Sequence, residues 1–558
     1  MLVVAFIAGL WWIIWSSAQA GRAQLSYESS HISLALTSLP YYVLRSVIRM
    51  VLAFLLSLAF TFVYGYIAAH NRVAEMVLIP LLDILQSVPV LGFLSVSVAS
   101  LVSLFPGSIL GYEIASILAI FTSQAWNMTF AFYQSLTSIP RDLREAASML
   151  RLSKWQTFKY LELPYSIISL VWNGMMSFGG GWFFLAASET ITVLGRDVQL
   201  PGIGSYMATA IRASSTSGLL AALVSMVAVI VVIDQIVWRP LVVWSRKFKV
   251  EMTASDEEPT SWVMELVKKS LLLSFLEDAF RPIGRFMAGY AERLRRGRRK
   301  GGRALRLISR VALICMDILI VGLLVRGAFW FVRGIWLLWS VLDIGDVLKV
   351  FYLGGLTLVR VMAAVFLGML WTIPAGVKIG TNPRLRRFLQ PVVQVLASFP
   401  ANMLFPFVTV LYIRYHISME IGSIPLMMLG TQWYLLFNVI GGAMSIPNDL
   451  NEASVVYGLR GIQRWTKFIL PAIFPSVVTG GITAAGGAWN ASIVAEVTSW
   501  GSTTLTATGL GSLISQATNS GDWAMIVLSI SAMAAIVVGV NRLFWRRLYA
   551  RAEEMRAM

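Results

Sequence analysis

The sequence predicts an all-α, polytopic membrane protein with about twelve transmembrane helices, arranged as two parallel six-helix repeats. Three observations lead to this fold class: the composition, apolar runs of membrane length, and an internal duplication. Of the 558 residues, 57% are hydrophobic and 13% are charged, whereas a soluble domain averages about 25% charged residues. Apolar runs such as 51–69 and 525–540 approach the length of about 20 residues that crosses a bilayer as a helix.

The chain contains two copies of one membrane unit. Residues 139–241 align with residues 446–548 at a constant offset of 307 without a gap, and the upstream segment continues the alignment at an offset of 311. The matched pairs include Arg49/Arg360, Pro89/Pro400, Glu145/Glu452, Pro164/Pro471, Gly179/Gly486, Glu189/Glu496 and Gly202/Gly509. Shared apolar composition would only scatter such matches, so the fixed register through Gly, Pro and Glu indicates a duplication.

Each copy is expected to hold six spans. They lie at about 2–19, 43–69, 76–101, 113–137, 166–188 and 218–241 in the first half, and at about 308–325, 351–377, 390–414, 421–445, 473–495 and 522–544 in the second. The start of the chain lacks a charged region and an obvious cleavage site, so we interpret residues 2–19 as a retained span, with a signal peptide as the alternative. The chain is therefore divided into a first membrane domain (1–245), a connector (246–306) and a second membrane domain (307–558).

The net charge of +17 lies mostly in short segments between the spans. Lys and Arg are concentrated in 141–159, 381–387, 460–467 and 542–556, whereas the loops on the opposite side are poor in both residues and rich in Ser, Thr and Gly. Cytoplasmic loops carry the excess of Lys and Arg in membrane proteins. We therefore expect a multi-pass protein of the cell membrane with both termini in the cytoplasm, and the even number of spans gives both halves the same orientation.

The connector ends in the basic run AERLRRGRRKGGRALR. We interpret this run as an anchor attracted to anionic lipid headgroups, in preference to a regulatory or nucleic-acid-binding role. The charge pattern thus predicts membrane lipid as a partner and no nucleic acid.

The sequence shows no catalytic or metal-binding constellation. The single cysteine, Cys315, lies in an apolar run, and His31, His70 and His416 are too scattered for a metal cluster. There is no Gly-x-x-x-x-Gly-Lys-Ser/Thr loop for ATP phosphates, and no Ser/His/Asp or Cys/His arrangement. We predict that this chain is not an enzyme and binds no metal or cofactor, so any ATP hydrolysis would take place on another chain.

Two amphipathic segments, 144–164 and 451–471, occupy matching places before the fifth span of each half. In the first copy, Ser138 or Asp142 can cap a helix, and Glu145 lies where the helix dipole favours negative charge. Each segment ends at Leu-Pro, where the next span begins. We predict that each forms a helix–turn–helix elbow projecting from the cytoplasmic face.

These segments resemble the EAA loop of ATP-binding-cassette (ABC) importer permeases. The first carries Glu-Ala-Ala at 145–147 and Leu-Pro at 163–164, but has Arg151 where the motif has glycine; the second carries Glu-Ala-Ser at 452–454, Gly458 and Leu-Pro at 470–471. Because glycine adopts a left-handed turn at little cost, we expect the first elbow to turn less easily or differently. The resemblance implies the type I ABC importer permease fold, in which the elbow is a coupling helix held in a groove of an ATPase.

The resemblance also implies partners and site residues. Two copies of a cytoplasmic ABC ATPase, carrying ATP and Mg²⁺, would bind the elbows, and an extracytoplasmic binding protein would deliver the solute. The residues assigned to ATPase coupling are Asp142, Glu145, Ala146, Ala147, Arg151, Asp449, Glu452, Ala453, Ser454 and Gly458. The rival hypothesis is a twelve-span secondary transporter working without an ATPase, and the two EAA-like segments count against it.

The ends of both halves resemble one subgroup of these permeases. PGIGSYMATAIRA (201–213) and TGLGSLISQATN (508–519) are similar to the Gly-Leu-Gly stretch of nitrate-, sulfonate- and taurine-type permeases. Asp234 matches the acid of that group's last span, whereas the second half has Asn541. The resemblance implies a small, anionic solute, and sulfonate, nitrate, taurine and bicarbonate all fit it.

The candidates for the translocation pathway are Ser87, Pro89, Glu189, Ser398, Pro400 and Glu496. Proline breaks, as in both third spans, are tolerated where the backbone lines a protein cavity, and an ionisable residue at membrane depth is a functional candidate. For the two glutamates, a role in packing or in holding a loop is an equal alternative. We interpret Arg49 and Arg360 as snorkelling to the interface rather than attracting anions, and the glycine pairs 179–180 and 486–487 as sites of close helix packing.

Overall fold

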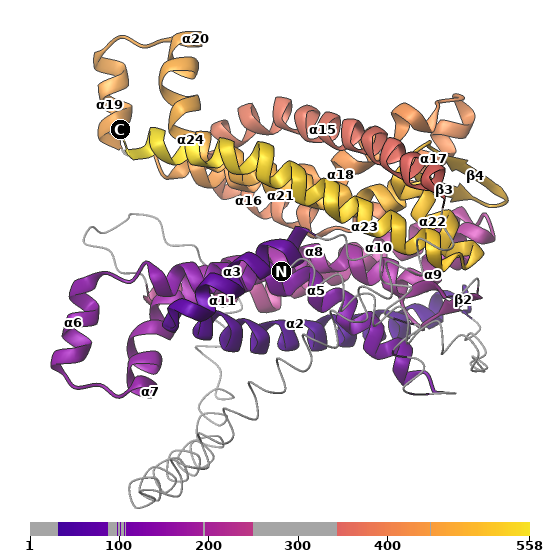
Figure 1. Ribbon diagram of the computed structural model, residues 1–558, viewed down its shortest axis with the longest axis horizontal. Helices are drawn as coiled ribbons and strands as arrows, with labels where there is room; N and C mark the ends of the chain where they lie inside the picture. The colour runs from indigo at the N-terminus through magenta and orange to yellow at the C-terminus, as the bar shows by residue number, and fades with distance from the viewer. Residues whose placement is uncertain are drawn as a thin grey trace, which may run out of the picture.

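The computed structural model describes residues 32–87, 108–193, 196–248, 343–446 and 448–557, with the single positions 98, 101 and 105. The expected first span of each half, Pro89 and the basic run of the connector lie outside the described residues. The two halves lie side by side, and each repeats the same order of elements (Figure 1).

The first half begins with a 3₁₀ turn, η1 (Leu36–Ser38), and the long helix α2 (Leu39–His70). Its further elements are α3 (Arg72–Ser87), α5 (Leu110–Thr137), α6 (Arg141–Met149), α7 (Lys154–Thr157), the π-turn η2 (Phe158–Glu162), α8 (Leu163–Ser188), β1 (Thr190–Val193), β2 (Arg196–Gln199), α9 (Ile203–Arg212), α10 (Thr216–Ile233), the π-turn η3 (Asp234–Trp238), α11 (Arg239–Ser245) and η4 (Arg246–Phe248).

The second half repeats this order, with its third span resolved into two pieces. Its elements are α15 (Ile344–Thr381), α16 (Pro383–Ser398), η5 (Ala401–Met403), α17 (Phe405–Arg414), α18 (Met419–Met444), α19 (Asn448–Val456), α20 (Gly461–Arg464), the π-turn η6 (Trp465–Ile469), α21 (Leu470–Ala495), β3 (Val497–Trp500), β4 (Thr503–Thr506), α22 (Leu510–Ser520), α23 (Trp523–Val540), the π-turn η7 (Asn541–Trp545) and α24 (Arg546–Ala557).

The short helices α6, α7, α19 and α20 project from one end of the molecule, which we call the elbow end (Figure 1). The β-strands and the short helices α9 and α22 lie at the opposite end, the hairpin end, and the C-terminus lies at the elbow end. Elbows and C-terminus thus share one end, as the charge pattern predicts; that this end is cytoplasmic remains a prediction.

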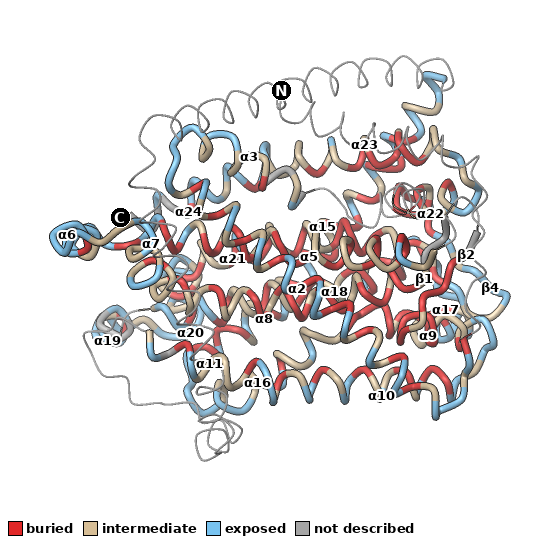
Figure 2. The backbone as a smooth tube through the Cα atoms, turned by 90° about the horizontal axis from the view of Figure 1, so that it is seen from below, coloured by how far each residue is buried: buried red, intermediate tan, exposed pale blue. Residues whose placement is uncertain are grey.

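Three long helices form the centre of each half: α2, α5 and α8 in the first, and α15, α18 and α21 in the second. Small residues let these helices approach closely. A Cβ on Gly65 of α2 would lie 2.7 Å from Phe132 Cδ1, and a Cβ on the equivalent Gly376 would lie 2.7 Å from Val439 Cγ1. Figure 2 shows the buried residues concentrated along the middle of the bundle.

Six helices among the described residues are long and apolar enough to cross a membrane: Leu36–His70, Thr216–Ser245, Ile344–Thr381, Met419–Met444, Gly461–Ala495 and Trp523–Ala552. Their outer faces keep large apolar side chains exposed; Leu55, Val359 and Phe366 are 55%, 67% and 61% exposed. Such surface is unfavourable in water and suits a hydrocarbon environment. The helices α5 and α8 are as long as their equivalents α18 and α21.

The third span of the second half is broken, as its proline predicts. The helix α16 ends at Ser398, Pro400 precedes the 3₁₀ turn η5, and α17 starts at Phe405. Proline lacks an amide N–H and cannot continue the helical ladder. In the first half the described part of α3 reaches Ser87, the position equivalent to Ser398, and the residues directly after it lie outside the described residues.

The fold departs from a purely helical one at the hairpin end. Each half carries a two-stranded antiparallel hairpin, with Thr190 paired with Gln199 and Val497 paired with Thr506. The low content of Lys and Arg predicts loops at 190–217 and 496–521, so these hairpins are a correction to the sequence-based prediction. Their β-branched residues favour strands, and Gly501 adopts a left-handed conformation (φ 59°) in the second turn. The amide of Gly501 also donates to Ile211 O at 3.1 Å and so joins the two halves.

Candidate functional site: an interface cavity between matched halves

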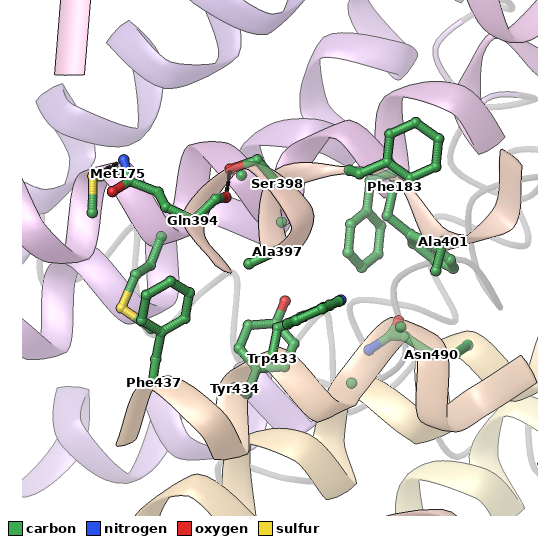
Figure 3. A pocket seen from close by; sticks show the side chains of 18 residues that line it. Met175, Phe183, Gln394, Ala397, Ser398, Ala401, Trp433, Tyr434, Phe437 and Asn490 are labelled. Atoms are coloured by element: carbon green, nitrogen blue, oxygen red, sulfur yellow. Dashed lines mark hydrogen bonds between the residues drawn. The ribbon is translucent and has the colours of Figure 1, made fainter. Parts of the chain in front are cut away.

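The two halves meet around a cavity of about 60 Å³ (Figure 3). The first half contributes α8, including Gly179, Gly180 and Phe183, whereas the second half contributes residues from α16, η5, α18 and α21. Its walls therefore combine helices that are far apart in sequence. The predicted pathway residue Ser398 lines this cavity and Pro400 begins the turn at its edge, whereas the side chain of Ser87 lies outside the described part of the chain.

Glycines of α8 allow the close contact at this interface. A Cβ on Gly179 would lie 2.8 Å from Ser398 Oγ, and a Cβ on Gly180 would lie 2.9 Å from Tyr434 Oη. Both distances are shorter than a carbon–oxygen contact normally allows. The close-packing interpretation is thus confirmed for this pair. In the second half a Cβ on Gly487 would meet Thr431 Cγ2 at 3.1 Å, but Gly486 has open space beside it.

A hydrogen bond across the interface holds the cavity wall. Gln394 of α16 donates from Nε2 to Asp234 Oδ1 at 2.5 Å, and its amide also lies 2.7 Å from the sulfur of Met175. Asp234 opens the π-turn η3 and is 5% exposed. At the equivalent positions of the other junction, α3 carries Asp83 and η7 opens with Asn541. In one junction the third-span helix carries the amide and η3 carries the acid, whereas in the other junction the third-span helix carries the acid and η7 carries the amide.

A buried ion-pair cluster joins α2, α5 and α8 near the hairpin end of the first half. Arg49 Nη1 lies 2.7 Å from Glu189 Oε1, and Arg49 Nε lies 2.6 Å from Glu113 Oε2. Ser46 donates to Glu189 Oε1 at 2.5 Å, and the Gly204 amide donates to Glu189 Oε2 at 2.7 Å. The Glu189 carboxylate is thus held by a guanidinium, a hydroxyl and the N-terminus of α9, where the helix dipole favours negative charge.

The second half repeats this arrangement of arginine and glutamates, with Thr357 in place of Ser46. Arg360 Nη1 lies 3.1 Å from Glu496 Oε1, and Arg360 Nη2 donates to Glu420 Oε2. Thr357 donates to Glu496 Oε1 at 2.8 Å, and the Ser512 amide donates to Glu496 Oε2 at 3.1 Å. The repetition of a costly buried arrangement in both halves indicates that it positions α9 and α22 on the bundle.

The two ion-pair clusters contain four residues that the sequence analysis singles out: Glu189, Glu496, Arg49 and Arg360. Glu189 and Glu496 are 0% exposed and are bonded within their own half, so the described cavity does not include them and the loop-holding alternative agrees with the geometry. The snorkelling interpretation of Arg49 and Arg360 is wrong, because both are buried, with 1% and 6% of their surface exposed. Their ion-pair partners compensate the charge that would otherwise seek the membrane interface.

Sequence analysis missed Glu113 and Glu420. The two glutamates occupy equivalent positions at an offset of 307, each in the first turn of the fourth expected span of its half, α5 and α18. A search for acids conserved between the two halves would have found them. Their partners are 64 and 60 residues away along the chain, so spacing alone could not pair them.

Gly202 of the PGIG stretch and Gly509 of the TGLG stretch leave space that a larger residue would fill. A Cβ on Gly202 would lie 2.2 Å from Glu189 Cδ, and a Cβ on Gly509 would lie 2.3 Å from Glu496 Oε2. Gly202 has an extended backbone (φ −179°) that any residue can adopt, so the requirement is space for the carboxylate and not an unusual backbone conformation.

The predicted elbows form in both halves: the first from α6 and α7, the second from α19 and α20 (Figure 1). The predicted side-chain cap does not form, because α6 starts after Pro140 without a side-chain cap and Ser138 Oγ donates to Ser135 O instead. Ala147 and Ser454 are the buried small residues of the two motifs, at 8% and 3% exposed.

Both elbows make the same turn. Gly458 has φ 68° as predicted, and Arg151 adopts φ 49° at the equivalent position. The Leu152 amide donates to Ala147 O at 3.1 Å, and the Leu459 amide donates to Ser454 O at 3.0 Å, which is the hydrogen bond of a helix-ending left-handed turn. The two elbows thus differ in backbone strain and not in shape. The left-handed conformation is unfavourable for Arg151, which has a Cβ, and costs little for Gly458.

We expect Gly458→Ala to destabilise the second elbow by about 1 kcal/mol, because the new methyl group meets no atom within 4 Å and only the left-handed backbone opposes it. Hydrogen exchange of the amides at 455–460 should then accelerate about fivefold. Arg151→Gly is the matched change in the other half and should slow exchange there or leave it unchanged. Equal exchange in the Gly458→Ala variant and the parent would contradict the strain argument.

Each elbow exposes large apolar side chains at the same three positions. Met149, Leu150 and Trp155 are 83%, 73% and 69% exposed, and their equivalents Val456, Tyr457 and Ile462 are 85%, 82% and 81% exposed. Glu145 and Glu452 are exposed beside them, whereas the side chain of Asp449 lies outside the described residues. Projecting apolar side chains rimmed by charge are typical of protein interaction sites.

Two matched helical halves that enclose a cavity and project an apolar elbow from the same end define the membrane domain of a transporter. The chain belongs to the family of binding-protein-dependent transport system inner membrane components, which matches it twice, at residues 61–237 and 364–550. The double match confirms both the duplication and the resemblance to importer permeases.

The chain is similar to permeases of known solutes. It is 27% identical over 187 residues to the nitrate import permease protein NrtB of Leptolyngbya laminosa, a match that covers 34% of this chain and 63% of that protein. It is 26% identical over 207 residues to the bicarbonate transport system permease protein CmpB of Synechococcus elongatus (37% and 71%), and 27% identical over 198 residues to the taurine transport system permease protein TauC of Escherichia coli (35% and 67%).

Proposed function

We propose that this chain supplies both membrane halves of an ABC importer for a small, anionic solute. Two copies of a separate ATPase, which carry ATP and Mg²⁺, dock on the two elbows, and an extracytoplasmic binding protein delivers the solute to the hairpin end. The chain itself binds no cofactor. Both termini face the cytoplasm of the cell membrane, and the basic connector lies against anionic lipid.

The observation that carries the proposal is the pair of elbows with three exposed apolar positions each. A secondary transporter has no use for two equivalent apolar projections into water, which cost free energy until a partner covers them. An ATPase pair with two equivalent grooves would cover both. The EAA-like residues Glu145 and Glu452 lie beside these positions.

The elbows are connected directly to the cavity. In the second half, α20, η6 and α21 form one continuous helix, Gly461–Ala495, which holds Ile462 at its start and the cavity residues Gly487 and Asn490 near its end. In the first half, α7, η2 and α8 lead in the same way from Trp155 to Gly179. Because these helices are continuous, closure of an ATPase pair would shift them as rigid bodies and so move the cavity walls. Release of the hydrolysis products would bring the walls back to their starting positions.

A double substitution of exposed elbow residues tests this proposal. Met149→Asp with Val456→Asp should reduce the ATPase that co-purifies with the tagged chain at least tenfold and abolish uptake, because the apolar contact is lost at both docking sites. The melting temperature should not change, since both side chains are more than 80% exposed. Co-purified ATPase is identified by mass spectrometry of its P-loop peptide.

Tyr415→Asp provides the control. Tyr415 is also exposed, at 65%, but it follows α17 at the hairpin end, so ATPase recovery should stay at the parental level. The secondary-transporter hypothesis predicts the opposite result: no ATPase with the parent chain, and uptake that survives in the elbow variant. That outcome would end the importer proposal.

A further inference from the structure

The interface cavity has aromatic and sulfur-containing walls. Phe183, Met175 and Met176 face it from the first half, and Trp433, Tyr434 and Phe437 face it from the second (Figure 3). Large apolar side chains of this kind bind ligand surface by excluding water from it. A solute with little apolar surface would gain nothing from them.

No cation lines the cavity in the described part of the chain. Arg49 and Arg360 are buried in ion pairs with glutamates of their own half and do not line the cavity. Behind the wall, the Gln394 amide donates to Asp234 at 2.5 Å, and Asp234 is itself ion-paired with Arg239 Nε at 3.4 Å, so this side offers an anion no unpaired positive charge.

These surroundings oppose a bare inorganic anion. Nitrate or bicarbonate would lose its hydration and find neither a positive charge nor enough hydrogen bonds in return. An organic anion is different, because burial of its apolar body against the aromatic walls is favourable. That contribution offsets the cost of removing water from its charged group.

Two neutral donors are available for such a head. Trp433 Nε1 and Tyr434 Oη have no acceptor among the described residues, and both side chains project from α18 into the space facing Ser398 and Phe183 (Figure 3). Hydrogen bonds from neutral donors to an ionised oxygen are stronger than those between neutral groups.

The duplicated positions do not contribute in the same way. Trp126, the equivalent of Trp433, packs against Phe60 and Phe121 with ring centroids 5.7 and 6.2 Å apart. Asn127, the equivalent of Tyr434, donates to Ser177 Oγ at 3.2 Å. Neither lines the described cavity, so the polar donors come from one half only.

We propose that the cavity binds a small organic anion, with an aromatic or alkyl body against Phe183, Phe437 and Met175 and a single anionic head that accepts from Trp433 Nε1 and Tyr434 Oη. Recognition is one-sided: α18 of the second half supplies the donors and α8 of the first supplies only apolar contact. This inference rests on the proposed importer function and narrows its solute from small anions in general to organic ones.

The test measures binding of radiolabelled benzenesulfonate to the purified full-length chain in lipid nanodiscs, with empty nanodiscs as the background. Saturable binding is expected. Unlabelled hexanesulfonate should compete, whereas nitrate and bicarbonate at the same concentration should not. Trp433→Phe and Tyr434→Phe, which each remove one donor, should weaken binding about tenfold, the effect of one charge-assisted hydrogen bond.

Trp126→Phe is the matched control, since it makes the same change at the duplicated position, and it should alter affinity less than twofold. The proposal is overturned by the absence of saturable benzenesulfonate binding, by competition from nitrate or bicarbonate, or by equal effects of Trp433→Phe and Trp126→Phe. A chain that fails this test but still retains ATPase through its elbows remains an importer with another class of solute.

Discussion

Gly509→Ala is expected to lower the stability of the protein by about 3 kcal/mol or more and to abolish uptake. The new Cβ would lie 2.3 Å from Glu496 Oε2 and 2.5 Å from Glu496 Cδ. The carboxylate cannot retreat, because Arg360, Thr357 and the Ser512 amide hold it. Overpacking costs about 1–3 kcal/mol, and displacement of a buried charge from its partners adds several more.

The measurement is thermal unfolding of the full-length chain in detergent, together with uptake in cells. Gly539→Ala is the control, because Gly539 lies in the helix α23 with no atom within 4 Å of a new Cβ. This change should be neutral or stabilise by about 0.5–1 kcal/mol, as expected when alanine replaces glycine within a helix. Gly202→Ala should reproduce the Gly509→Ala result in the first half. If Gly509→Ala melts like Gly539→Ala, the carboxylate is not fixed as described.

Arg49→Met is expected to destabilise the protein by about 3–5 kcal/mol, the cost of leaving one buried partner of an ion pair without its counter-charge. Glu189 is 0% exposed and would lose its cation, so that only a hydroxyl and an amide would remain to hold its buried carboxyl group. Glu113 would be less affected, because Arg45 also lies 2.5 Å from it. The loss should appear as a lower melting temperature and as loosening of α9 in hydrogen exchange.

A second substitution separates charge from packing. Arg49→Met with Glu189→Gln removes the uncompensated charge and should recover at least half of the lost stability, because apolar replacements of buried ion pairs are often nearly neutral. Arg360→Met tests the same relation in the second half. A double variant as unstable as Arg49→Met alone would show that the guanidinium acts by filling space and not by its charge.

The clusters and the elbows have complementary roles in the proposed cycle. The clusters fix α9 and α22 to the central helices at the hairpin end, whereas the elbows project from the other end of α8 and α21. A movement imposed at the elbows would then act on helices held firmly at their far ends. The cavity lies between these two points on α8 and α21, so it is the part that has to change shape.

Local signals in the sequence predicted most of the fold. The fixed offset of 307 identified the duplication, the Leu-Pro pairs located the starts of α8 and α21, and Gly458 predicted the left-handed turn that φ 68° confirms. Pro400 predicted the break in the third span. Each of these features depends on residues within a few positions of one another, where backbone geometry follows from side-chain type.

The sequence therefore determined the class of the protein, its two halves and the position of its elbows. Only the tertiary structure decided that Arg49 is buried with Glu113 and Glu189, that Gly202 provides space for a carboxylate, and that Trp433 faces the cavity while its twin Trp126 does not. These contacts join helices that are distant in the chain, and they depend on how the helices rotate and pack. Two duplicated segments with matching periodicity can thus have different surroundings, because the packing of one half against the other need not be symmetric.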